Sequence, residues 1–116
     1  MSSITTHVLD TARGRPAAGV PVLLELLLEQ RAGSEEWAER GRGTTDAGGR
    51  IKDLVTGPVV PGVYRLTFDT SAYFRAQKVE GFYPSVAIVF EVRDPAQHHH
   101  VPLLLSPFGY STYRGS

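Results

Sequence analysis

Cysteine is absent from this 116-residue sequence, which therefore has neither disulfide bonds nor thiolate chemistry. An excess charge of either sign is also lacking, because twelve basic residues balance twelve acidic ones. This balance argues against a nucleic-acid or membrane partner. No apolar run approaches the roughly 20 residues of a membrane-spanning helix, and residues 1–6 lack the basic and apolar regions of a secretory signal. We expect a neutral, soluble, cytoplasmic protein with a single domain over residues 1–116.

Short runs rich in β-branched and aromatic residues, separated by glycine and proline, make up most of the chain. Residues 4–10, 63–69 and 86–92 have the composition and alternation of strands with one buried face. The leucine-rich run 20–29 is compatible with a helix. Its early proline and the glycines around it favour two strands joined near residues 32–34.

Only one segment has the start signal of a helix. Asp69 and the two residues after it offer N-cap oxygens, so we expect a short helix over residues 71–78 that ends before Gly81. Residues 98–116 predict a β-hairpin that runs to the last residue, with a turn at 106–109 that has proline second and glycine fourth. Seven or eight strands and one helix, without βαβ alternation, predict an all-β, two-sheet antiparallel sandwich.

Histidine and arginine supply groups for chemistry near neutral pH. His7 lies in the first expected strand, and His98 and His100 open the terminal hairpin. Histidine exchanges protons in this pH range, which makes His7 and His100 candidates for acid–base catalysis. Arg50 follows a glycine-rich turn at 46–49, which can aim its guanidinium at an anion or a developing oxyanion. The less specific interpretations are that His7 is an exposed strand residue and that Arg50 is a solvated arginine in a turn.

The histidine run also raises a metal-binding alternative. Residues two apart on a strand share a face, so His98 and His100 could both ligate zinc, with His7 as a third ligand. The chain supplies no obvious carboxylate nearby to orient such ligands. We therefore expect no metal, and a channel-lining or rim position for His98.

Several segments resemble one known family. They are residues 6–10 (Thr-His-Val-Leu-Asp), 46–50 (Asp-Ala-Gly-Gly-Arg), 64–70, 100–107 and the final tetrapeptide 113–116 (Tyr-Arg-Gly-Ser). Together they resemble the 5-hydroxyisourate hydrolases, the transthyretin-related enzymes of purine breakdown, over essentially the whole chain. The final tetrapeptide is the most specific mark, because transthyretin hormone carriers lack it.

This resemblance implies a transthyretin-like sandwich that forms a homotetramer, a dimer of dimers with active sites in the channel between them. It implies hydrolytic opening of the six-membered ring of 5-hydroxyisourate to 2-oxo-4-hydroxy-4-carboxy-5-ureidoimidazoline, without metal or cofactor. The catalytic positions that match the family are His7, Arg50, His100 and Ser116. The matching substrate-binding positions are His7, Arg50, Tyr113, His98, Arg114 and Gly115.

The expected mechanism divides the work among these residues. His7 and His100 activate and position water, and Arg50 stabilises the oxyanion. Tyr113 and the tail orient the flat ring. Ser116 contributes its terminal carboxylate and is not expected to be a covalent nucleophile.

Two positions depart from the family pattern, because His99 and Phe108 stand where tyrosine is more usual. Strand alternation turns His99 away from His98 and His100, so we expect little effect on the site. Phe108 lies in the expected turn and removes only one hydroxyl.

The alternative function on the same fold is a non-catalytic carrier of a small molecule. A carrier channel would favour apolar or small side chains where this sequence has His7, His100 and Tyr113. Without the resemblance, the polar tail reads as an edge strand that deters aggregation, and Arg114 as a residue that pairs with a carboxylate or spans a subunit boundary.

Overall fold

The computed structural model describes residues 3–116. Met1 and Ser2 lie outside this range. They belong to the single domain expected over residues 1–116 and to the segment expected to lack a secretory signal. The described elements are β1 (Ile4–Asp10), β2 (Arg15–Pro16), β3 (Pro21–Arg31), β4 (Ser34–Thr44), β5 (Gly62–Phe68), α1 (Thr70–Ala76), β6 (Val86–Val92), β7 (His99–Ser106) and β8 (Gly109–Thr112). Within residues 3–116, the predicted number of strands and the single helix are confirmed.

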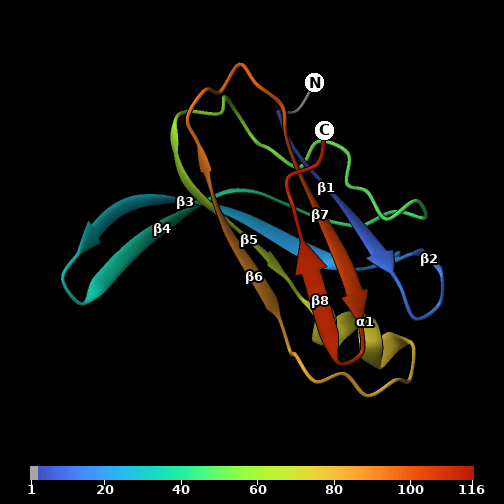
Figure 1. Ribbon diagram of the computed structural model, residues 1–116. Coiled ribbons are helices and arrows are strands. Elements are labelled where there is room, and N and C mark those ends of the chain that lie inside the picture. Colours follow the sequence, from blue (N-terminus) through green and yellow to red (C-terminus); the bar gives the residue numbers. More distant parts are fainter. Residues whose placement is uncertain (1–2) are drawn as a thin grey trace.

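Two four-stranded sheets face each other, as the sequence predicted. One has the order β2-β1-β7-β8 and the other has the order β4-β3-β5-β6. The described strands pair antiparallel, except that β1 pairs with β7 in parallel. Figure 1 shows β1 in blue beside β7 in orange-red, with β8 next to it. The terminal hairpin therefore shares a sheet with the first strand.

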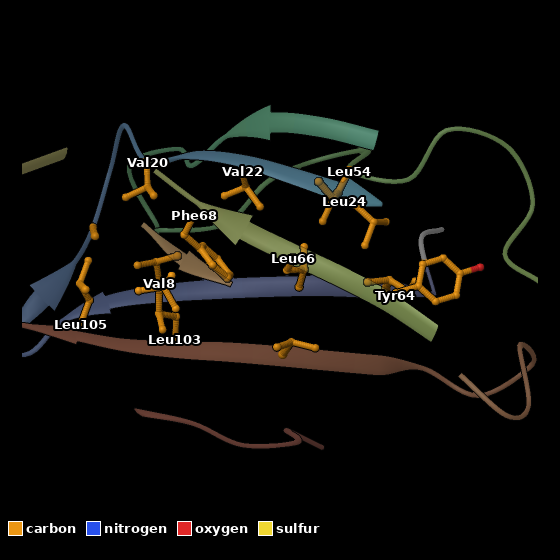
Figure 2. Packing of buried hydrophobic residues seen from close by; sticks show 14 of the residues in the cluster. Val8, Val20, Val22, Leu24, Leu54, Tyr64, Leu66, Phe68, Leu103 and Leu105 are labelled. Carbon is orange, nitrogen blue, oxygen red and sulfur yellow. The ribbon is translucent and has the colours of Figure 1, made fainter. Parts of the chain in front are cut away.

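Apolar side chains from the two inner faces fill the space between the sheets (Figure 2). Ile4 and Val8 of β1 are fully buried, and alternation along β5 buries Tyr64, Leu66 and Phe68, as predicted. Full burial of one large apolar side chain contributes about 1.5–3 kcal/mol. The residues that alternate with these buried ones point to the outer faces of the sheets.

The helix α1 is shorter than the expected span 71–78. Asp69 caps it as predicted, because its Oδ1 accepts an amide of the first turn at 2.9 Å. The helix ends early because Lys78 takes the left-handed conformation, with φ of 58°. Gly81 instead lies against Phe74, where an added Cβ would come within 2.5 Å of the ring. Within residues 3–116, no helix has the length and hydrophobicity that a membrane span requires.

The sequence predicted a terminal hairpin that runs to the last residue, and the structure shows an interruption within it. Regular pairing of β7 with β8 stops where Leu103 faces Thr112. Pro102 has no amide hydrogen, and its carbonyl accepts a bond from the Thr112 hydroxyl at 2.7 Å. Pairing resumes near the end, where the Gly115 amide donates to the His100 carbonyl at 2.8 Å.

A buried carboxylate ties α1 to β1. Asp10 is 3% exposed, and its Oδ2 accepts a hydrogen bond from the Tyr73 hydroxyl at 2.6 Å. Its Oδ1 accepts a bond from the Arg13 amide at 3.0 Å. Burial, and then the bond and charge of Asp10, raise the pKa of Tyr73. The tyrosine is therefore kept as a hydroxyl donor.

Tyr73→Phe should lower the free energy of unfolding by about 1–3 kcal/mol, because it leaves a buried oxygen of Asp10 without its donor. Urea denaturation at a fixed protein concentration measures this change. In a double-mutant cycle with Asp10→Asn, the two losses should be less than additive, because both changes disturb one bond. Strict additivity would show that the two groups are not coupled.

Candidate active site

Polar side chains gather on the outer face of β1 and β7. Thr5 and His7 alternate with the buried residues of β1 and point outward. The half-buried His100 lies on the same face of β7, whereas His99 is turned inward and is 5% exposed, as strand alternation predicted. In the parallel register, Thr5 lies opposite His100 and His7 lies opposite Pro102. The structure therefore brings together two histidines from opposite ends of the chain.

A tight turn brings Arg50 to this face. Asp46 Oδ1 accepts the Arg50 amide at 3.1 Å, and this bond is the main reason that the pKa of Asp46 lies below its ordinary value. The Val8 amide donates to the Gly49 carbonyl at 2.8 Å, and a β-bridge pairs Arg50 with His7. The sequence placed Arg50 after a turn, and the structure places that turn against β1.

Gly49 makes this contact possible. Its φ is +76°, and an added Cβ would lie 2.3 Å from the Val8 carbonyl oxygen and 3.2 Å from His7 Cδ2. Both the backbone conformation and the space therefore require glycine. Any side chain here would move Arg50 away from His7.

The end of the chain covers His100. Besides the backbone bond between them, Gly115 lies so close to the imidazole that an added Cβ would be 2.5 Å from His100 Cδ2. Ser116, beyond this contact, is exposed. The tail therefore shields one side of the His100 ring with backbone.

Arg114 holds the tail to the loop before β7. Its Nη2 lies 3.3 Å from the His98 carbonyl oxygen and 3.4 Å from Gln97 Oε1. Among residues 3–116 no ion pair joins Arg114 to a side-chain carboxylate, so these neutral oxygens take the place of the expected carboxylate. Tyr113 is 57% exposed and lines, with His100 and Arg114, a cavity of about 150 Å³.

The surroundings of His100 favour the neutral imidazole. Burial is the main cause that lowers the pKa of His100. The nearby charges of Arg50, His98 and His7 lower it further. A lowered pKa leaves more of the ring neutral near pH 7, and only the neutral ring can accept a proton.

Thr5 also lies on this face, although its residue type alone did not predict a role in the site. Its hydroxyl oxygen lies 2.7 Å from Nε2 of the exposed His98 and 2.8 Å from Nδ1 of His100. Strand alternation, which places Thr5 beside His7, was the available signal. By contrast, His7 Nε2 is buried without a hydrogen-bond partner in the described range.

The three outward histidines do not form a metal site within one chain. Among residues 3–116, no group of three or more histidine or acidic side chains is placed to hold a metal ion. The hydroxyl of Thr5 lies between His98 and His100 instead. The metal-binding alternative therefore has no ligand set in this part of the chain.

Gly115→Ala should raise the pKa of His100 toward its ordinary value, because the new Cβ displaces the tail and exposes the ring to water. An NMR titration of the His100 imidazole measures this change. Gly109→Ala is the matched control, since a Cβ there meets only Ser106 Oγ at 3.7 Å. An unchanged pKa in Gly115→Ala would show that the tail does not shield His100.

Comparison with known proteins connects this geometry to a family. The model of the HIUase/Transthyretin family matches residues 4–115. A probable 5-hydroxyisourate hydrolase of Caenorhabditis elegans is 47% identical over 117 residues, which cover 99% of this chain and 82% of that protein. The structure of 5-hydroxyisourate hydrolase from Klebsiella pneumoniae has a TM-score of 0.78 and 37% identity, covering 100% of this chain and 94% of that one. Transthyretin from Sparus aurata has a TM-score of 0.85 and 32% identity, covering 99% and 97%. The chain belongs to the HIUase/Transthyretin family.

Proposed function

We propose that this chain hydrolyses 5-hydroxyisourate, opening the six-membered ring at a carbon–nitrogen bond to give 2-oxo-4-hydroxy-4-carboxy-5-ureidoimidazoline. The observation that carries the proposal is the convergence of His7, Arg50 and His100 on the outer face of one sheet. Opening a cyclic amide needs a base for water, a positive charge for the oxyanion and groups that hold the ring. A 47% identical relative that carries the name of this activity supports the same reaction.

His100 acts as the base in this proposal. Its lowered pKa keeps the imidazole neutral, so it can take a proton from the attacking water. His7 lies beside Arg50 in the β-bridge between them, and it positions the water or the ring.

Arg50 stabilises the charge that develops on the attacked carbonyl oxygen. Its backbone is held by the turn and by β1, while its side chain is exposed on the outer face. One such donor typically accounts for a factor of about 10²–10³ in rate. Tyr113, His98 and the tail, with the terminal carboxylate of Ser116, hold the ring against His100.

A carrier is the rival on this fold, and the high TM-score with Sparus aurata transthyretin is the observation in its favour. Fold similarity does not separate the two functions. The polar residues of the outer face favour hydrolysis, because a basic imidazole and a guanidinium serve a reaction better than they serve an apolar ligand.

His7→Asn and Arg50→Ala should each reduce turnover of freshly made 5-hydroxyisourate by about 10²-fold or more, because each removes a group that acts on the transition state. Deletion of residues 113–116 should reduce it at least as strongly. The decay of ultraviolet absorbance of the substrate, with and without protein, measures all three.

Lys52→Ala is the matched control for Arg50, since Lys52 is an exposed cation two positions further along the same loop. It should retain the parental rate. Parental rates in both His7→Asn and Arg50→Ala would refute the assigned roles. A parental protein that binds the substrate without accelerating its decay would favour the carrier.

We also propose that the chain assembles as a homotetramer. An aromatic patch is exposed where the loop before β6 meets the turn between β7 and β8, and it comprises Phe82, Tyr83, Phe108 and Tyr110. The Phe82 amide donates to the Pro107 carbonyl at 2.7 Å. The rings of Tyr83 and Tyr110 pack edge to face, with their centroids 5.2 Å apart. An exposed apolar patch of this kind favours contact with another subunit.

Phe82→Glu should shift the protein to a smaller species, because a charge in a buried subunit contact is costly. Sedimentation velocity at several concentrations measures the species present. Leu28→Glu is the control, since Leu28 is comparably exposed, at 52%, but lies on β3 outside the aromatic patch. Equal sedimentation of Phe82→Glu and the parent would exclude the patch from the interface.

Three further expectations stay predictions. They are a single domain over residues 1–116, a cytoplasmic location, and a small-molecule substrate as the partner in place of nucleic acid or membrane.

A further inference from the structure

The Thr5 hydroxyl connects two histidines. Its oxygen lies 2.7 Å from His98 Nε2 and 2.8 Å from His100 Nδ1, both within hydrogen-bond distance. The contact is built into the sheet, because Thr5 of β1 lies opposite His100 of β7 in the parallel register. His98 is further positioned by Arg114, whose Nη2 donates to the His98 carbonyl at 3.3 Å.

A hydroxyl carries one proton, so it donates to one neighbour while it accepts from the other. Thr5 is therefore fully bonded only when one of the two facing ring nitrogens is protonated and the other is not. In the first arrangement, His100 Nδ1–H donates to Thr5, and Thr5 donates to His98 Nε2. In the second arrangement, both bonds run in the opposite direction.

The two arrangements give His100 opposite chemical characters. In the first, the proton sits on Nδ1 and the neutral ring offers a lone pair on Nε2, which is the form of a base. In the second, Nδ1 accepts from Thr5 and Nε2 carries the proton, which is the form of an acid. The state of His98 is thereby coupled to that of His100.

We propose that Thr5 relays a proton from His100 to His98 during turnover, so that the base sheds its proton to solvent through the side chain of His98. The inference rests on the proposed function and extends it to how the base is reset. Thr5 acts through the histidine and is a positioning residue in this scheme.

Protons balance at every step. His100 Nε2 takes a proton from the attacking water, and the ring becomes an imidazolium. Nδ1 then passes its proton to Thr5 Oγ1, and Thr5 passes its own hydroxyl proton to His98 Nε2. His100 is left neutral with its proton on Nε2, and His98, now cationic, releases its Nδ1 proton to water. When the carbon–nitrogen bond breaks, His100 Nε2 gives its proton to the leaving ring nitrogen, while Thr5 gives its proton to His100 Nδ1 and His98 Nε2 gives its proton to Thr5. His98 then takes a proton from water at Nδ1, so all three residues return to the first arrangement.

The surroundings favour this outward direction. His100 is half-buried, the charges of Arg50 and His7 act on its ring, and the Gly115 backbone lies close to it. Tyr113, Arg114 and Glu91 line the same cavity as His100. His98 is exposed, so a proton that reaches its ring can pass directly to water.

Thr5→Val tests the relay, since valine keeps the β-branched shape and removes only the hydroxyl. We expect kcat to fall about tenfold to a hundredfold, because the general base is slow to shed its proton, while KM stays near the parental value. Thr5→Ser should restore most of kcat. Thr11→Val is the matched control, because Thr11 directly follows β1 and its hydroxyl donates to the Leu105 carbonyl instead of a histidine. This variant should keep the parental kcat.

His98→Gln supplies the coupling test. His98→Gln and Thr5→Val should each reduce kcat, and the double variant should be no worse than the slower single variant, because both remove one relay. Nitrogen-15 NMR of the His98 and His100 rings gives a second readout. Complementary protonation of Nε2 and Nδ1 in the parent should be lost in Thr5→Val.

The outcomes separate this inference from the proposed function. A parental protein that does not accelerate substrate decay refutes the function itself. An active parent with an unimpaired Thr5→Val variant overturns the relay alone. Equal losses in Thr5→Ser and Thr5→Val, or multiplicative losses in the double variant, also overturn it, since neither result would depend on a shared hydroxyl.

Discussion

The parallel pairing of β1 with β7 is the constraint on which the candidate site depends. It places Thr5 against His100, a residue 95 positions away in the chain. A slip of β1 by one residue would turn every side chain to the opposite face, with His7 entering the core and Val8 leaving it. The buried apolar side of β1 therefore fixes the register, and the register fixes the polar face. Packing of the core and geometry of the site are set by the same contacts.

Elements with strong local signals were predictable from the sequence. β1 and β6 have the expected bounds, because their composition and alternation match a strand with one buried face. Asp69 caps α1 as expected, because a carboxylate before the first turn satisfies an otherwise free amide. The end of α1 was less predictable. Glycine is the usual residue for a left-handed stop, yet Lys78 takes that conformation, and Gly81 is used for close packing against Phe74.

The parts of the candidate site that could not be predicted from the sequence are those set by contacts between distant segments. A threonine in a strand carries no mark of function by itself, and Thr5 acquires one only because the register presents two imidazoles to its hydroxyl. Similarly, Gly49 and Gly115 look like ordinary turn and tail glycines. The need for glycine at these two positions appears only in the folded structure, where β1 and His100 occupy the space that a side chain would fill. Family resemblance located the histidines and Arg50, but it did not supply these supporting contacts.

The alternation of strands explains how one sandwich occurs both in a transthyretin and in a 5-hydroxyisourate hydrolase. Outward residues of β1 and β7 can change without disturbing the inward residues that hold the sheets together, so similar folds remain with different outer faces. In this chain, the backbone at Gly49 lies against His7, and the backbone at Gly115 lies against His100. Both rings are thus confined by main chain, which limits their motion and shields them from water. Catalysis gains from such confinement, because a base and a cation held in place need little reorganisation when charge develops.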